Sequence, residues 1–511
     1  MRLTTERILF YLFCILSASP LLFSHYPPMV DIPQHAAVIA TLNNLALPDF
    51  PYHDLYYLDW MRPYLGGYLI LWGVSQFLPI LLAVKLLIAA AVIAIPITAS
   101  RLRAHFGGDV GWDWLLLPIS YGMAFQWGFF NFIIGAPIVL LFLLSAFKFS
   151  ETPSLRTGIW LTFFAHSLLL IHLLVAAFGC GLAFLYVIAR KSQWKQKILT
   201  GLPFISPLPV VIIYLFVWVS SSGLASGEGS WDLSIYRPFQ FLSSAVGLPA
   251  NNSNAAIGLL FFALPFLLGA RLTNSRPRQA VFVAYLLWMM FGPNYILGTF
   301  FTYNRFALFG IPMLFLVISK PSSTTRSEKY DTLLRSLLFI LPVTLIIFYC
   351  FRFSSFDDES KGYRDIETKM QPHKRVLGLI YNNQSPVFGN LPTYMHFASW
   401  YQAEHSGVTD FSFSQFGLLV RYKPDAAVAI PRGGFSWRPD SFDWNLHKGW
   451  LYDYFVVRNE GDISSHIFRT AECPVKYVTH SGSWWLYETE LGDANDPRSC
   501  AAKRIAENQL K

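Results

Sequence analysis

Long apolar runs are the feature of this sequence that most restricts its fold. They recur from residue 8 to residue 351 and then stop, which divides the chain into a block of apolar runs, 1–351, and a more polar block, 352–511. Only 14% of the residues are charged, whereas about a quarter are charged in ordinary soluble proteins. Apolar stretches of this kind form membrane-spanning helices. The first block is therefore predicted to be an α-helical multi-pass membrane domain.

The apolar runs predict about 11 or 12 transmembrane helices. The first run, residues 8–24, lacks a convincing cleavage site and is expected to be an uncleaved span, with a signal peptide as the alternative. Several runs are shorter than the ~20 residues of a straight span, so tilted or re-entrant segments are expected. The count depends on residues 65–100, which Pro79 splits in two. The remaining runs are 65–79, 80–100, 112–126, 129–147, 157–171, 173–189, 201–219, 256–270, 279–292, 305–319 and 335–351.

The chain has a net charge of +8, and the positions of its basic residues are related to the apolar runs. Its basic residues gather in short loops between those runs, which is typical of cytoplasmic loops and argues against a nucleic-acid partner. The N-terminus is then cytoplasmic, and loop 25–63, loop 220–255 and the C-terminal block share the external side. The basic loops lie near residues 101–103, 148–156, 190–197, 271–278 and 320–335.

The C-terminal block, 352–511, is predicted to be an extracytoplasmic α/β domain. It has no phosphate-binding glycine loop and no zinc pattern, so we expect it to support the membrane domain or to dock an acceptor. Cys473 and Cys500 are its two cysteines and are expected either to form a disulfide or to remain thiols. Strand-like runs at 375–381, 425–431, 452–458, 475–480 and 483–489 accompany a helical stretch at 391–407.

Ionisable side chains near a membrane are costly unless they are paired or face water, so they mark candidate sites. Asp31 and His35 lie just beyond the first run, in the segment VDIPQHAAVIATL. The residues after Pro33 have the spacing of an amphipathic helix at the membrane surface. Asp31 is then either the N-cap of that helix, or a general base or metal ligand with His35 one turn away.

Arg305, in FFTYNRFALFG, begins a late apolar run on the predicted external side. It is either a snorkelling arginine or a guanidinium that binds a phosphate at headgroup depth, with hydrogen bonds added by Tyr303 and Asn304. Lys85 is a second candidate cation at membrane depth.

Two amides and two histidines complete the set of polar candidates. Gln126 and Asn131 lie where two apolar runs meet, and they bind substrate or form hydrogen bonds between helices. His166 and His172 are too far apart along a helix to share one face, so a metal pair is not expected from them.

Several motifs resemble the GT-C class of membrane glycosyltransferases, in particular a bacterial group of this class whose activity is poorly defined. The resemblance covers about residues 1–350 and implies an inner-membrane enzyme that transfers a sugar, with inversion, from a polyprenyl-phosphate donor to an external glycan, lipid or protein. It implies a catalytic role for Asp31 and a carrier-phosphate role for Arg305, and His35, Asn131 and His172 match the pattern. The motifs are DIPQHAAVIA, WGFFNFIIG, IHLL and YNRFALFGIPMLFL.

The sequence departs from the better characterised members of the class in one respect. It lacks an adjacent pair of acidic residues in the first external loop, where Asp54 and Asp59 are the nearest substitutes. A divalent cation, Mg²⁺ or Mn²⁺, is therefore an open expectation, with Asp31 as its first candidate ligand. Two other functions are left as alternatives: a transporter or flippase of lipid-linked saccharides, and a non-catalytic subunit of an envelope polysaccharide system.

Overall fold

The computed structural model describes residues 5–61, 64–222, 229–249, 252–296, 299–320, 328–416, 418–424, 426 and 434–509. Its internal contacts divide the chain into two compact units. Unit 1 comprises residues 1–22 and 87–350, and unit 2 comprises residues 23–86 and 351–511. The units differ from the predicted blocks 1–351 and 352–511, because residues 23–86, which include loop 25–63, pack with the C-terminal block.

Five segments of the described chain are long and apolar enough to cross a membrane. The protein is therefore rich in helices that are compatible with a membrane-embedded chain. Shorter apolar helices of 10–17 residues accompany them. The five segments are Thr5–Leu22, Ile80–His105, Phe130–Glu151, Trp194–Val217 and Lys329–Glu367.

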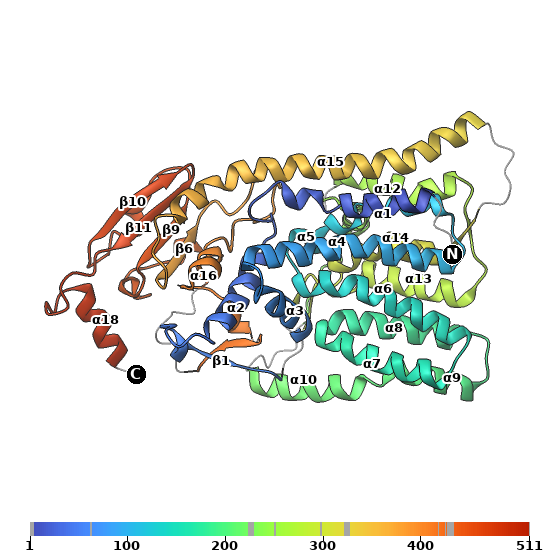
Figure 1. The fold of residues 1–511 in the computed structure, drawn as a ribbon, viewed down its shortest axis with the longest axis horizontal. Helices are drawn as coiled ribbons and strands as arrows, with labels where there is room; N and C mark the ends of the chain where they lie inside the picture. The colour runs from blue at the N-terminus through green and yellow to red at the C-terminus, as the bar shows by residue number, and fades with distance from the viewer. Residues whose placement is uncertain are drawn as a thin grey trace. The chain divides into compact units, whose positions relative to one another are not determined.

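Unit 1 is a helical assembly in which α6, α7, α8 and α9 lie side by side (Figure 1). Its core is a continuous cluster of buried aliphatic and aromatic side chains drawn from most of its helices. The helices are α1 (Thr5–Leu16), the part of α4 (Ile80–His105) from residue 87, α5 (Met123–Gln126), α6 (Phe130–Glu151), α7 (Leu155–Ile171), α8 (Leu173–Ala189), α9 (Trp194–Ile205), α10 (Leu208–Ser222), α11 (Arg237–Ala245), α12 (Asn252–Leu267), α13 (Arg276–Phe291), α14 (Gly310–Val317) and the part of α15 (Glu328–Glu367) up to residue 350.

Short elements connect these helices. Two antiparallel pairs join β2 to β5 and β3 to β4. The short elements are η1 (Ser19–Leu22), η3 (Val110–Leu116), η4 (Ile119–Tyr121), η5 (Asn304–Phe309), β2 (Arg271–Leu272), β3 (Tyr295–Ile296), β4 (Thr299–Phe300) and β5 (Ile318–Ser319).

Three predicted apolar runs do not form long helices, and one of them, run 305–319, divides into η5, the eight-residue α14 and β5. Run 112–126 breaks into η3, η4 and α5, so the prediction of a transmembrane helix there is wrong. Pro118 and Gly122 interrupt it, and Asp113, which lies inside it, forms a buried ion pair with Arg103, 2.5 Å between Oδ1 and Nε. Run 65–79 forms only α3 (Leu65–Ser75), whose 11 residues are fewer than the ~20 of a straight span.

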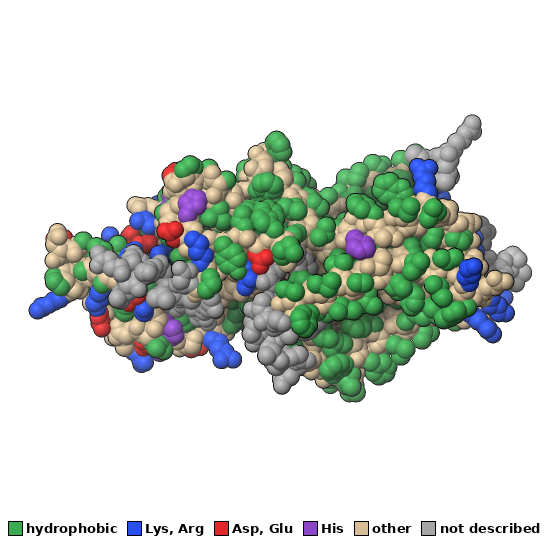
Figure 2. Space-filling model, turned by 90° about the horizontal axis from the view of Figure 1, so that it is seen from below, with side chains coloured by type: hydrophobic (Ala, Val, Ile, Leu, Met, Phe, Trp, Pro, Cys, Tyr) green, Lys and Arg blue, Asp and Glu red, His purple; other side chains and the backbone are tan. Residues whose placement is uncertain are grey.

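Basic side chains of unit 1 meet at one end of its helices. The guanidinium of Arg278 lies 4.6 Å from the centre of the Phe106 ring. Arg271 pairs in β2 with Ser319 of β5. Figure 2 shows hydrophobic side chains over most of the visible face of the helices and Lys and Arg side chains at one end. Basic side chains from loops that are distant in the sequence therefore lie at the same end of the helices.

Unit 2 is built around a five-stranded sheet of order β10-β11-β9-β6-β7. β6 pairs in parallel with β7 and β9, and β9, β11 and β10 pair in antiparallel fashion. The sheet strands are β6 (Arg375–Ile380), β7 (Val408–Thr409), β9 (Tyr454–Arg458), β10 (Val475–Ser481) and β11 (Trp484–Thr489). A separate antiparallel pair joins β1 (Tyr56–Leu58) of the first loop to β8 (Val420–Tyr422).

Helices and short turns surround this sheet. The predicted helix 391–407 forms only near its end, as α16, and the predicted strand 425–431 lies outside the described residues except for Ala426. Cys473 and Cys500 form a disulfide. The elements are α2 (Ile32–Asn44), η2 (His53–Leu55), α3, the first residues of α4, the end of α15, α16 (Ser399–His405), η6 (Phe413–Phe416), η8 (Pro439–Ser441), η9 (Gly449–Leu451), α17 (Ser464–Ile467) and α18 (Cys500–Gln509).

Candidate functional site

Helix α2 follows Asp31 directly and lies inside unit 2. Its residues 32–42 are all buried, so the prediction of an amphipathic helix at the membrane surface is wrong. The physical reason is that its polar side chains pair with protein groups instead of water. Gln34 donates from Nε2 to Ser399 Oγ at 2.8 Å, and Gln402 of α16 donates to Thr41 Oγ1 at 3.0 Å. The predicted helix is present, but residues of α16 cover its polar positions.

Asp31 stands at the N-cap position of α2 without using its side chain as a cap. Its backbone is helical, with φ −91° and ψ −9°, and no cap hydrogen bond is formed by the carboxylate. The side chain is 16% exposed, and its Oδ1 lies 3.7 Å from Nε2 of His396. The capping interpretation therefore does not hold, and the carboxylate faces a histidine of the C-terminal block.

His35 lies one turn along α2 and belongs to the same cluster. Its Nδ1 is 2.6 Å from the hydroxyl of Tyr68 in α3. The ring of Phe413 lies edge-on to both imidazoles, with centroid distances of 5.3 Å to His35 and 5.7 Å to His396. Three separate segments of the chain thus enclose Asp31: α2, α3 and the region around α16.

Aromatic rings form the rest of the surroundings of His396. Phe411 stacks on its imidazole at 5.2 Å with an interplanar angle of 11°. Trp437 lies at 6.2 Å and is 55% exposed. The cluster therefore changes from a dry interior around His396 to an exposed indole at its edge.

Both imidazoles of the cluster are neutral at neutral pH. Burial lowers the pKa of His35 to about 3. Burial, followed by the proximity of His35, lowers the pKa of His396 to about 3. The Asp31–His396 contact is consequently not an ion pair under these conditions, and its 3.7 Å separation exceeds hydrogen-bond length. A carboxylate beside a neutral imidazole is a candidate proton acceptor.

Arg305 lies in unit 1, at the start of η5, and is buried with an exposed fraction of 6%. Its guanidinium stacks 3.8 Å from the centre of the Phe129 ring, and its Nη2 donates to the carbonyl of Phe300 at 2.6 Å. A snorkelling arginine keeps its charged head in water, so that alternative does not describe Arg305. The side chain is held rigidly between an aromatic face and backbone carbonyls.

His172 lies near Arg305 through a shared neighbour, Phe132, which follows Asn131 in α6. The Arg305 guanidinium is 5.8 Å from the Phe132 ring centre, and the His172 ring is 5.6 Å from it. His172 ends α7 and caps α8, accepting from the N–H of Leu174 at 3.2 Å. His172 therefore lies at the break between α7 and α8, whereas His166 lies inside α7.

Two amide oxygens in this region are buried without a hydrogen-bond partner among the described residues, Asn131 Oδ1 and Asn304 Oδ1. Tyr303 is engaged with Arg237, whose guanidinium lies 3.9 Å from its ring centre. Gln126 of α5 donates to the carbonyl of Tyr121 at 2.9 Å, and both residues belong to the segment that connects α4 to α6. Unsatisfied buried oxygens are rare and point to a missing polar partner such as water or a ligand.

The remaining candidates have other partners. Lys85 donates from Nζ to the carbonyl of Ser24 at 2.7 Å, which ties α4 to the first loop. Asp59 is paired with Arg421, 3.1 Å between Oδ2 and Nη1, and Asp54 is exposed. Within the described ranges no group of three or more His, Cys, Asp or Glu side chains is placed to hold a metal ion.

His396, Tyr68, Phe413 and Trp437 were missed by reasoning from the sequence alone. His396 lies in the aromatic string YMHFASW, a setting that favours a buried core histidine. The sequence around His396 therefore gives no reason to select it as a site residue. Its proximity to Asp31 is visible only in the folded chain.

No protein-family model matches the sequence, and no curated protein matches it significantly.

Proposed function

We propose that this protein is an integral membrane glycosyltransferase that moves a sugar from a polyprenyl-phosphate carrier to an acceptor hydroxyl. The observation that carries the proposal is the carboxylate of Asp31. It is partly exposed, makes no cap bond and lies 3.7 Å from the buried, neutral imidazole of His396. A carboxylate in such a setting is suited to general-base catalysis.

The reaction has one proton transfer and one exchange of C–O bonds. Asp31 takes the proton of the acceptor hydroxyl while the acceptor oxygen attacks the anomeric carbon. The bond between that carbon and the carrier phosphate breaks, and the carrier leaves as a phosphate anion. Attack opposite to the leaving group inverts the anomeric centre. His396 acts as a positioning residue that packs beside the Asp31 carboxylate and limits its rotation, and Trp437 offers an apolar face to the sugar ring.

Arg305 belongs to unit 1 and Asp31 to unit 2, and we propose separately that Arg305 binds an anion such as the carrier phosphate within unit 1. Its planar guanidinium is already stacked on Phe129 and hydrogen-bonded to backbone, so little conformational entropy is lost when an anion binds. The unpartnered oxygens of Asn131 and Asn304 support a polar ligand in the same region. Both oxygens accept hydrogen bonds and therefore suit the hydroxyl groups of a sugar.

The proposal is tested with the purified full chain in proteoliposomes that contain tritiated polyprenyl-phosphate sugars and an extract of cell-envelope glycolipids as acceptor. The release of polyprenyl phosphate is measured for wild type, Asp31→Asn and Asp49→Asn. Asp49 is an exposed carboxylate of the same loop, so its variant makes the same charge change outside the cluster.

Wild type and Asp49→Asn are expected to release the carrier, and Asp31→Asn is expected to be at least about 100-fold slower. Binding of polyprenyl phosphate, measured separately by equilibrium dialysis in detergent, should be equal in all three. Equal turnover by Asp31→Asn would refute the catalytic role. Movement of the intact donor across the bilayer without carrier release would favour the transporter alternative.

A further inference from the structure

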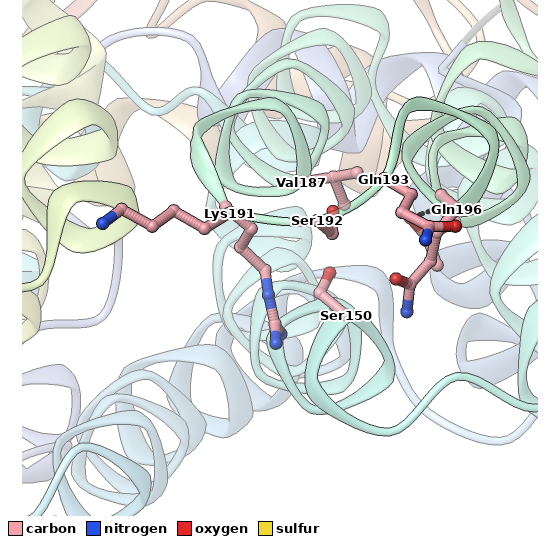
Figure 3. A pocket seen from close by; sticks show the side chains of 8 residues that line it. Ser150, Val187, Lys191, Ser192, Gln193 and Gln196 are labelled. Carbon is pink, nitrogen blue, oxygen red and sulfur yellow. Dashed lines mark hydrogen bonds between the residues drawn. The ribbon is translucent and has the colours of Figure 1, made fainter.

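A pocket of about 320 Å³ lies in unit 1 where α6 and α8 end and α9 begins. Figure 3 shows Ser150, Ser192, Gln193 and Gln196 around one space, with Lys191 directed away from it. Its walls are mostly polar, and none of the lining side chains is acidic. The lining residues are Ser150, Val187, Arg190, Lys191, Ser192, Gln193, Gln196 and Thr200.

Arg190, which lines the pocket, has a guanidinium nitrogen with unmet hydrogen-bonding capacity. Nη1 of Arg190 is buried and has no hydrogen-bond partner among the described residues. A buried donor of a charged group is costly when it is left unpaired. The neighbouring carboxylate, Glu151, lies instead near His105 and Tyr186, at 3.5 Å and 3.3 Å. An acceptor that enters the pocket is therefore the natural partner of Arg190.

Helix α9 adds a second source of positive potential. It begins at Trp194, and its N-cap residue Gln193 forms no side-chain cap bond. The N–H groups of the first turn of a helix are unpaired within the helix and carry part of its positive dipole. Gln193 and Gln196 line the pocket, so this turn borders the same space as Arg190. Together they favour an anion over a neutral ligand.

Exposed apolar side chains lie on α9, which contributes to the pocket lining, and on the neighbouring helix α7. On α9, Trp194, Ile198 and Leu199 are 67%, 50% and 57% exposed. On α7, Leu155 and Ile159 are 83% and 62% exposed. A lipid needs an apolar surface for its acyl chains and, for an anionic headgroup, a basic site at the end of the apolar helices. This region offers both.

We propose that this pocket binds a phosphate group, and that the phosphate belongs to the headgroup of an anionic membrane lipid. Arg190 and the first turn of α9 hold the phosphate, the hydroxyl and amide groups of Ser192, Gln193 and Gln196 contact the headgroup, and α7 and α9 receive the acyl chains. The site is independent of Asp31 and of glycosyl transfer. Inorganic phosphate has the same chemistry and is the other source that the test must separate.

The test uses the full-length protein in detergent after its native lipids have been removed. Native mass spectrometry measures the retention of added phosphatidylglycerol, and equilibrium dialysis measures the binding of radiolabelled inorganic phosphate. Arg190→Ala is compared with Lys191→Ala, because both remove one positive charge from adjacent positions and only Arg190 has a buried nitrogen in the pocket. Gln196→Glu is a second variant, which introduces a negative charge on a helical residue and does not depend on the removal of a packed side chain.

Wild type and Lys191→Ala are expected to retain phosphatidylglycerol alike, whereas Arg190→Ala and Gln196→Glu should bind it at least about tenfold more weakly. Equal retention by wild type, Arg190→Ala and Gln196→Glu would overturn the proposal. Phosphate binding that is lost in Arg190→Ala, together with unchanged lipid retention, would support an anion site and refute the lipid as its source. An equal loss in Lys191→Ala would reduce the effect to general surface charge and would also overturn it.

Discussion

The carboxylate of Asp31 and the imidazole of His396 lie 3.7 Å apart, Oδ1 to Nε2, although one belongs to the first loop and the other to the C-terminal block. Both belong to unit 2, so the contact is part of a single compact body. The first loop and the C-terminal block are therefore one structural element. Beyond the supporting or docking role expected from the sequence, the C-terminal block supplies His396, a neighbour of Asp31, the proposed catalytic base.

The first prediction concerns His396 as a positioning residue. His396→Gln is expected to lower kcat by about 10- to 100-fold, because small errors in the orientation of a base are costly. The KM for the polyprenyl-phosphate donor should stay nearly unchanged. Steady-state kinetics of carrier release separates the two parameters. A rise in KM with kcat unchanged would assign His396 to binding and contradict the positioning role.

A second prediction concerns the polar seam between α2 and α16. Gln34 forms hydrogen bonds with Ser399 Oγ, with the carbonyl of Phe411 and with the N–H of Phe413. Gln34→Ala leaves these buried groups unpaired and should lower the free energy of unfolding by about 2–4 kcal/mol. Thermal unfolding monitored by tryptophan fluorescence is the measurement. Gln76→Ala removes an exposed glutamine of the same unit and serves as the control, with a change within about 0.5 kcal/mol.

Arg305 provides a third prediction. Arg305→Lys keeps the charge but loses the planar group that stacks on Phe129. If the guanidinium binds the carrier phosphate, the KM for the donor should rise by about tenfold, because an ammonium group cannot reproduce the fork of two donors. Arg271→Lys, at an exposed position of β2, makes the same substitution as a control. An unchanged KM in Arg305→Lys would remove Arg305 from the donor site.

The pH dependence of stability gives a fourth prediction. The pKa of His35 and that of His396 are both lowered to about 3 by burial, so between pH 3 and 6.5 the unfolded chain binds more protons than the folded one. Their contribution to stability is complete above pH 6.5 and is lost as the pH falls toward 3, by about 1.4 kcal/mol per pH unit for each fully titrating histidine. Burial also raises the pKa of Asp410 to about 6, and this acts in the opposite sense.

His396→Gln removes one of these contributions. Between pH 4 and 6 the unfolding temperature of the variant should therefore depend less steeply on pH than that of wild type. Unfolding curves at several pH values provide the comparison. Parallel curves for the two proteins would show that His396 is not neutral and buried in the folded state.

The disulfide between Cys473 and Cys500 supports a fifth prediction. It closes a loop with a sequence separation of 27 residues, and a loop of that size restricts the unfolded chain by about 3–4 kcal/mol. The double variant Cys473→Ser/Cys500→Ser should unfold at a lower temperature than wild type in the absence of reductant. Dithiothreitol should destabilise wild type and leave the double variant unchanged, and an equal effect on both proteins would contradict a structural disulfide.

Much of the helical part could be predicted from apolar periodicity, because a run such as 130–151 has few polar residues and therefore forms one long helix. Run 112–126 is also apolar, but it contains Asp113 together with Pro118 and Gly122, and it forms short turns instead of a helix. Average hydropathy does not register a single buried ion pair or two breaking residues. A prediction based on average hydropathy therefore assigns a helix to run 112–126 where the structure has short turns.

The sequence alone determined that the chain is rich in apolar helices, that its basic residues fall in the loops between them, and that Asp31, His35 and Arg305 are unusual in their surroundings. These features depend on local composition and spacing, which are written along the chain. Only the tertiary structure decided that α2 is buried under α16 and that His396 meets Asp31. Contacts between segments so distant in sequence depend on which surfaces pack together. The hydrogen bonds between α2 and α16 and the contact between Asp31 and His396 are of this kind, and no local sequence pattern predicts them.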